Sequence, residues 1–145
     1  HSGVVEITTE NGSAVLYVSQ SNASLKTSWI GDRVQADVSV KAALSIAEIT
    51  GFEGESLDNV FQILEKAAVE HVVELISKAF EKSFALSADI FGIGNSMGRT
   101  DPKLWEQIKP DWPDIYPETV LNISAEGVLL ESGKISSSLT MKGEE

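Results

Sequence analysis

The side chains best suited to chemistry in this sequence lie in a short segment that begins at Asp89. Two closely spaced glycines, Gly92 and Gly94, follow the aspartate, and Arg99 comes next. The planar guanidinium group of arginine matches a carboxylate, whether that of a small ligand or that of an acid in the chain. We therefore expect residues 92–99 to form a fixed loop held by an internal ion pair. The alternative is a pocket for a small molecule, with this loop as its rim.

Two carboxylates are candidates for the internal partner of Arg99. Asp89 stands at the expected exit of a helix, and Glu48 falls in the apolar phase of an alternating strand. That phase would point Glu48 toward the core, where a carboxylate without a cation is costly. We expect one of the two acids to bind Arg99 and fix the loop.

Aromatic and proline residues follow the same segment. Pro102, Trp105, Trp112 and Tyr116 all lie within a short stretch. Proline fixes its own backbone angle, and large rings bury much apolar area, so we expect Trp105 and Trp112 to pack over a sheet edge. The alternative is that the two tryptophans anchor a partner protein, because such residues concentrate binding energy.

The segment resembles the C-terminal part of the Ger(x)C proteins, the lipoprotein C subunits of spore germinant receptors. The resemblance lies in Asp-Ile-Phe-Gly-Ile-Gly from Asp89, followed by Arg99, Pro102-x-x-Trp105, Trp112-Pro113 and Tyr116, and it extends over roughly residues 4–130. It implies the last domain of such a subunit, which works beside the A and B membrane subunits of a receptor for small nutrients. It also implies a lipid anchor, outside this fragment, on the outer face of the spore inner membrane.

No arrangement of residues indicates an enzyme. The sequence has no cysteine, and His71 lies among apolar residues of an expected helix without a partner that would make it a base. The glycines after Asp89 follow a helix, which favours a helix stop over a phosphate-binding loop. Ser96 does not stand in a nucleophile elbow. We predict a non-enzymatic interaction domain that needs no cofactor and no metal.

Composition limits the class of partner. Eleven Lys and Arg residues against 22 Asp and Glu give a net charge of −11, which disfavours nucleic acid and anionic lipid headgroups as partners. No apolar run reaches the roughly 20 residues that span a membrane. We expect a vector-derived remnant at residues 1–3, one soluble domain over 4–130, and a weak edge strand or disordered tail over 131–145.

Hydrophobic periodicity predicts the elements that hold the segment. A hairpin is expected around Asn11-Gly12, and strict alternation predicts a strand over residues 34–47. Apolar residues spaced by three and four then predict a long helix from Leu57, with Ser56 as its cap.

The remaining elements are shorter. Asp101 and Pro102 favour a helix over residues 103–108, and a final strand is expected over 119–125, interrupted by Gly127. The order predicts an α+β fold, in which a long amphipathic helix and a short helix pack on one face of a largely antiparallel sheet.

Overall fold

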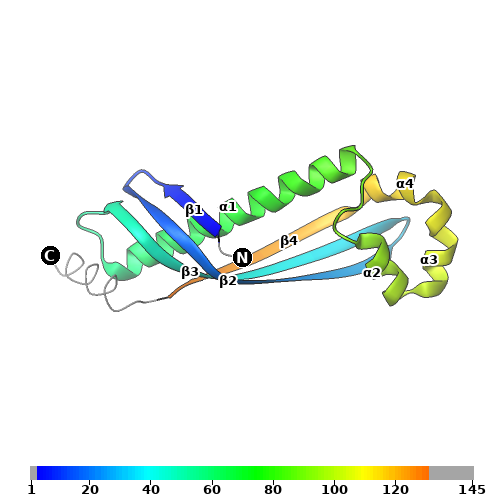
Figure 1. The fold of residues 1–145 in the computed structure, drawn as a ribbon, viewed down its shortest axis with the longest axis horizontal. Helices are drawn as coiled ribbons and strands as arrows, with labels where there is room; N and C mark the ends of the chain where they lie inside the picture. The colour runs from blue at the N-terminus through cyan, green and yellow to red at the C-terminus, as the bar shows by residue number, and fades with distance from the viewer. Residues whose placement is uncertain (1–2, 131–145) are drawn as a thin grey trace. The chain divides into compact units, whose positions relative to one another are not determined.

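The computed structural model describes residues 3–130, which form a four-stranded sheet and four α-helices. The strands β1 (Gly3–Thr8), β2 (Gly12–Ile30), β3 (Arg33–Gly51) and β4 (Val120–Leu129) pair in this order (Figure 1). Between β3 and β4 the chain forms α1 (Leu57–Ala85), α2 (Ile93–Thr100), α3 (Pro102–Ile108) and α4 (Trp112–Ile115), with 3-10 turns at Lys109–Asp111 and Tyr116–Glu118. The α+β class is confirmed. Residues 1 and 2 of the expected remnant 1–3, and the whole tail over 131–145, lie outside the described residues.

The sheet is mixed rather than purely antiparallel. β1 and β2 pair antiparallel, as the predicted hairpin requires. The connection from β2 to β3 consists only of Gly31 and Asp32. Strands joined by so short a turn must be antiparallel, so β2 and β3 pair in this way. Side chains at positions 37, 39 and 41 of β3 contact those at 122, 124 and 126 of β4 in the same order, so β3 and β4 run parallel. The helices between them supply the long crossover that a parallel pair needs.

The chain divides into two compact units, each with its own apolar core. Among the described residues, unit 1 contains 3–22, 41–72 and 125–130, and unit 2 contains 23–40 and 73–124. The elements β2, β3, α1 and β4 contribute residues to both units. That residues 4–130 act as a single domain stays a prediction.

Unit 1 packs the start of α1 against the first three strands. Its buried core includes Ile7, Leu16, Leu44, Ile46, Phe52, Val60, Leu64 and Ala68. Ser56 caps α1 as predicted, because its hydroxyl accepts the Asn59 N–H at 3.2 Å. Gly12 is needed for close approach, since a Cβ there would lie 2.5 Å from the carbonyl oxygen of Thr50.

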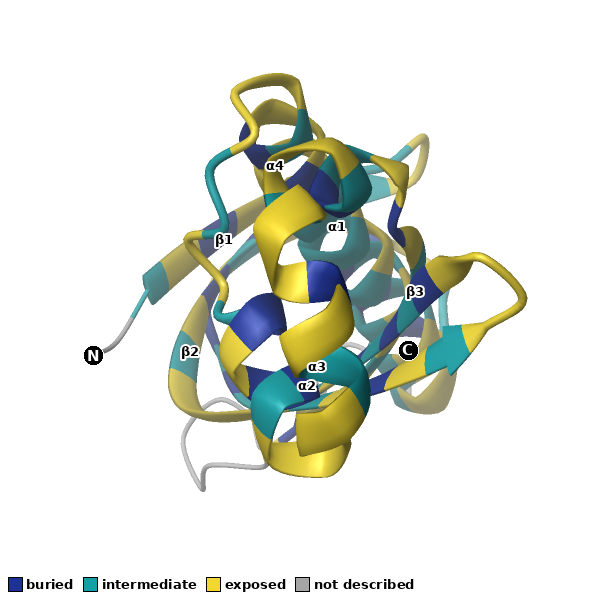
Figure 2. Cartoon of the chain, turned by 90° about the vertical axis from the view of Figure 1, so that its right-hand side faces the viewer, coloured by how far each residue is buried: buried dark blue, intermediate teal, exposed yellow. Residues whose placement is uncertain are grey.

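Unit 2 packs the end of α1 and the shorter helices against β3. Its buried core is formed by Val34, Ala36, Val38, Phe80, Ile93, Met97, Ile108 and Tyr116. Figure 2 shows buried positions alternating with exposed ones along the helical part of this unit. The cap of α3 follows the prediction, since the carboxylate of Asp101 accepts the Leu104 N–H at 3.1 Å and Pro102 stands in the first turn.

Strand β2 changes the face that it turns toward a core. Leu16 is buried at an even position and Thr27 at an odd one, whereas the buried positions of β3 are even from Val34 to Ile46. Side chains alternate along a regular strand, so a change of parity in β2 but not in β3 requires one extra residue in β2 between Leu16 and Thr27. One extra residue on one of two paired strands is a β-bulge. Residues 19–24, all exposed, provide the place for it.

Strand β4 continues through Gly127, contrary to the predicted interruption. A Cβ at this position would lie 3.2 Å from Cδ1 of Leu44 and 3.6 Å from Cγ2 of Val69. Glycine therefore makes room for the side chains of β3 and α1 rather than ending the strand.

Candidate functional site

The segment from Asp89 to Tyr116 lies within unit 2, and its first residue caps a helix. The backbone N–H of Ile93 donates to Oδ1 of Asp89 at 2.9 Å, and that of Gly94 donates to Oδ2 at 2.7 Å. Gly92 precedes the helix in the left-handed region, with φ of 76°. The carboxylate thus satisfies two of the N–H groups that the start of a helix leaves unpaired. The expected loop over residues 92–99 is therefore helix α2.

Replacing Asp89 by alanine should cost more stability than removing the cap of the neighbouring helix. Asp89 accepts two backbone bonds and is part-buried, whereas Asp101 is exposed and accepts one. We expect Asp89→Ala to lower the free energy of unfolding by about 2 kcal/mol and Asp101→Ala by about 0.5–1 kcal/mol. Urea denaturation followed by tryptophan fluorescence measures both variants. An equal loss from the two would refute the assigned role of Asp89.

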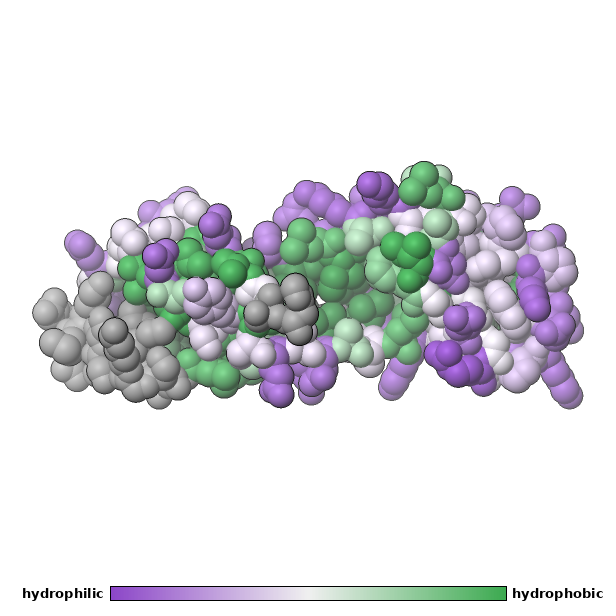
Figure 3. Space-filling model, in the orientation of Figure 1, coloured by the Kyte–Doolittle hydropathy of each residue, from purple (hydrophilic) through white to green (hydrophobic). Residues whose placement is uncertain are grey.

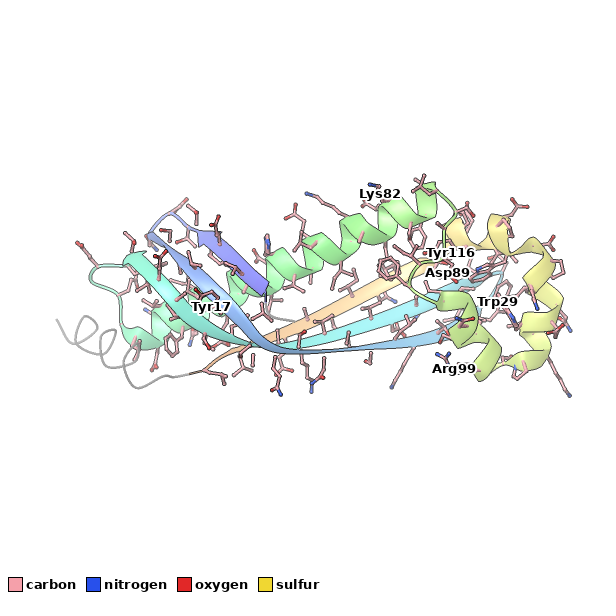
Figure 4. The ribbon with its side chains drawn as sticks, viewed as in Figure 1. Tyr17, Trp29, Lys82, Asp89, Arg99 and Tyr116 are labelled. Atoms are coloured by element: carbon pink, nitrogen blue, oxygen red, sulfur yellow. The ribbon has the colours of Figure 1, made fainter. Side chains whose placement is uncertain are left out.

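Arg99 does not bind Asp89. It lies in the last turn of α2, at the end opposite to the cap, and its side chain is exposed (Figure 4). Both carboxylate oxygens of Asp89 are taken by backbone N–H groups. The ion pairs found within residues 3–130 do not include Arg99. The predicted Asp89–Arg99 pair is therefore wrong. Arg99 instead lies at the C-terminal end of α2, where a cation interacts favourably with the helix dipole.

Glu48 is exposed rather than turned toward the core. Leu44 and Ile46 are buried in unit 1, but the next side chain that packs against this core is Ile49. The inward positions of β3 thus change from even to odd after Ile46. The strict alternation used in the prediction assumed an unbroken register, so the expected burial of Glu48 and its need for Arg99 are wrong.

Gly94 and Gly98 let a tryptophan lie against α2. The two glycines are four residues apart, so they share one face of the helix. A Cβ on Gly94 would lie 2.8 Å from Cη2 of Trp105 and 3.2 Å from Nε1 of Trp112, and a Cβ on Gly98 would lie 3.2 Å from Cδ1 of Trp105. The spacing of these glycines is therefore a packing device between α2 and the indole rings.

The aromatic rings form a continuous cluster around Tyr116. Trp105 and Trp112 meet edge to face with ring centroids 5.0 Å apart, and Trp112 lies 5.7 Å from Tyr116. Phe84 meets Tyr116 from α1 at 5.0 Å. Both tryptophans are partly buried against the core of unit 2. The expectation of ring packing fits this position better than the alternative of two exposed anchors.

Tyr116 is the fully buried centre of this cluster. Its hydroxyl lies 2.7 Å from Oγ of Ser83, and Ser83 donates to the carbonyl oxygen of Phe80 at 2.8 Å. Because the serine has one proton, Tyr116 donates to Ser83. Burial raises the pKa of Tyr116 above its ordinary value, and the charge of Asp89 adds to this effect. Tyr116 therefore stays neutral and serves as a structural donor.

Ser96 and Thr27 form a buried link that the sequence did not reveal. Their hydroxyl oxygens are 2.7 Å apart, and the residues are 5% and 7% exposed. The bond joins α2 to β2, and it occupies the hydroxyl group of Ser96. The one available signal was that Thr27 shares the face of Leu25 and Trp29 in an extended segment.

Loss of both partners of this link should destabilise unit 2 by less than the sum of the two single losses. Thr27→Val leaves the hydroxyl of Ser96 buried without its partner, at a cost of roughly 1–2 kcal/mol. Thr27→Val combined with Ser96→Ala should cost less than the two single changes together. Chemical denaturation of the four proteins of this double-mutant cycle measures the coupling. Additive losses would show that the hydroxyl groups do not interact.

The buried and part-buried polar groups described above are thus committed to holding the structure of unit 2. Asp89, Ser83 and Ser96 all bind other groups of unit 2. Within residues 3–130, no three His, Cys, Asp or Glu side chains gather to hold a metal ion. What remains available for recognition in this segment is exposed surface, such as that around Arg99.

Comparison with known proteins identifies the family. Residues 1–133 match the family described as "Spore germination B3/GerAC like, C-terminal". The fold is similar to the crystal structure of the GerBC protein, with a TM-score of 0.78 and 16% sequence identity. The similarity covers 90% of this chain but 41% of that one, so the chain spans less than half the length of this relative.

Two further findings complete the comparison. No curated protein sequence matches the chain. None of the helices among residues 3–130 has the length and hydrophobicity that crossing a bilayer requires.

The match over residues 1–133 includes the whole segment from Asp89 to Tyr116, which confirms the resemblance found in the sequence. The chain belongs to the spore germination B3/GerAC-like family, whose C-terminal domain it represents.

Proposed function

We propose that this chain is a non-enzymatic interaction domain of the C subunit of a spore germinant receptor. Its role is to help assemble or couple the receptor, so that a nutrient signal reaches the germination machinery. Its partners are the receptor's A and B membrane subunits. The full-length protein is held by a lipid anchor at the outer face of the spore inner membrane, with this domain outside the bilayer.

The observation that carries the proposal is the family match over residues 1–133. The local structure supports an interaction role over a catalytic one, because the Ser96 hydroxyl, the Tyr116 hydroxyl and the Asp89 carboxylate bind other side chains or the backbone. A general base or nucleophile needs free access to a substrate. A rigid scaffold with an exposed surface suits docking.

The alternative function is binding of a small germinant at residues 92–99. The structure weakens its basis, because Ile93, Gly94, Ser96 and Met97 of α2 are buried in unit 2. Arg99 is exposed and lies away from this buried face (Figure 4). We expect amide chemical shifts of residues 92–99 to stay unchanged when amino acids or sugars are added at millimolar concentration. Localised shifts there would favour the binding function instead.

Assembly of the receptor tests the proposal directly. The full-length C subunit is produced with tagged A and B subunits, and the three are expected to co-purify. Deletion of residues 4–130 of this chain from the C subunit should abolish this association, while the surface change Asn95→Leu should preserve it. Immunoblotting confirms equal amounts of each variant. Normal assembly and germination after the deletion would refute the proposal.

A further inference from the structure

The exposed large apolar side chains of unit 1 all lie on one face of its sheet. Among the described residues these are Val4 and Tyr17, 58% and 52% exposed, and Val128 and Leu130, 49% and 48% exposed. Their neighbours Val5, Leu16 and Leu129 are buried in the core. Side chains alternate along a strand, so the four exposed residues point to the face away from that core. We call this surface the outer face of unit 1.

The strand register brings these residues into one patch. Val4 stands directly opposite Tyr17 in the pairing of β1 with β2. The Ser19 hydroxyl donates to the Ala43 carbonyl at 3.0 Å, and the Leu130 N–H donates to the Leu44 carbonyl at 2.7 Å, which ties β3 to its neighbours on both sides.

Small side chains surround the tyrosine. On the outer face β3 presents Ala43 and Ser45, whose side chains are small. Figure 3 shows apolar side chains over β1 and the adjoining part of β2, with hydrophilic ones beside them, and Figure 4 places Tyr17 there. Tyrosine on a rigid sheet is a frequent centre of protein interfaces.

Two hollows border the patch, and one of them is acidic. One hollow of about 230 Å³ has Glu6 and Glu48 in its lining, together with Ser13 and Thr50. Neither glutamate takes part in an ion pair within residues 3–130. A second hollow of about 210 Å³ includes Lys41 and Glu126, whose charged atoms are 4.0 Å apart.

The charge of unit 1 differs from that of unit 2. The described residues of unit 1 contain nine acidic side chains and two lysines, whereas those of unit 2 contain ten acidic and seven basic side chains. The hollows beside the outer face contain Glu6, Glu48 and Glu126 against the single cation Lys41, so this face is an apolar ridge with an acidic rim. Two such faces would repel each other, and anionic headgroups would be repelled as well.

We propose that the outer face of unit 1 docks a receptor partner subunit whose contacting surface has an apolar centre and a lysine or arginine that enters the Glu6–Glu48 hollow. The inference rests on the proposed function and names the surface that performs it. Tyr17 supplies the buried anchor of the interface. The carboxylates select a basic partner and speed its approach.

Photo-cross-linking in the full-length protein tests this surface. A photoreactive phenylalanine replaces Tyr17, and a matched control carries it at Ser28, which is also exposed on β2 but belongs to unit 2. The tagged A and B subunits are co-produced and the cross-linked products are identified by mass spectrometry. We expect a cross-link from position 17 to the A or B subunit and none from position 28.

Substitutions supply the second measurement. Tyr17→Ser and Glu48→Lys should each weaken association by about tenfold or more, whereas Glu70→Lys, an equal charge change on α1, should leave it unchanged. The thermal midpoint should stay that of the parent, since none of these side chains is in the core. Assembly that persists in both variants, without a cross-link, would overturn this surface and leave the proposed function standing.

Two other outcomes also decide against the proposal. A cross-link to a second copy or within the same chain would overturn the assigned partner. Failure of the parent protein to associate with A or B would overturn the proposed function itself, and the inference with it.

Discussion

Tyr116→Ala is expected to lower the free energy of unfolding of unit 2 by about 3–5 kcal/mol, the cost of removing a large buried ring. Tyr116 is fully buried and contacts Phe84 and Trp112, so the cavity would lie at the centre of the aromatic cluster. All three tryptophans, at positions 29, 105 and 112, belong to unit 2. Tryptophan fluorescence during urea denaturation therefore follows this unit specifically. An unchanged fluorescence transition would refute the central role of the ring.

Tyr116→Phe separates the hydroxyl group from the ring. It keeps the packing and removes the bond to Ser83, so we expect a loss of about 1 kcal/mol near neutral pH. The pKa of Tyr116 is raised in the folded protein. Its stabilising contribution is therefore complete below pH ~10, the pKa of an unfolded tyrosine, and is lost as the pH rises through the folded pKa. The difference between parent and Tyr116→Phe should shrink above that pH, and a constant difference would contradict the assignment.

Gly94→Leu is expected to destabilise unit 2 by about 3 kcal/mol, at the upper end of the cost of overpacking. Even a Cβ at this position would lie 2.8 Å from Trp105 and 3.1 Å from the carboxylate of Asp89, so a larger side chain must displace the rings and the cap together. The gain of about 1 kcal/mol in helix propensity is too small to compensate. Urea denaturation measures the loss, and near-ultraviolet circular dichroism reports the displaced indole rings.

Asn95→Leu provides the matched control for this variant. Asn95 is the next residue of the same helix, and it is exposed. The same side chain introduced there should change the unfolding free energy by no more than about 0.5 kcal/mol. If the two leucine variants were equally stable, close packing of Gly94 against the rings would be wrong.

Local signals in the sequence sufficed where one residue acts on its immediate neighbours. Ser56 before α1 and Asp101 before α3 cap their helices as expected. The alternating strand from Val34 was equally visible, because its buried positions keep one parity as far as Ile46. The family resemblance rested on the residues around Asp89, and the match over residues 1–133 confirms it.

The errors arose where distant residues override the local pattern. Helix α2 contains two glycines and was expected as a loop, yet it is held by the Asp89 carboxylate and by packing of Trp105. Glu48 was assigned to the core because a change of strand register leaves no mark in one sequence. Its exposure removed the reason for a partner, and with it the expected ion pair to Arg99.

The extra residue in β2 also limits how the length of this chain can change during evolution. Deleting one residue among positions 19–24 would remove the bulge and leave Leu16 and Thr27 facing their own cores, since this stretch is exposed. A single deletion elsewhere in β2 would turn one set of core side chains toward solvent. Related chains should therefore gain or lose single residues in this short stretch and keep the length of the rest of the strand constant.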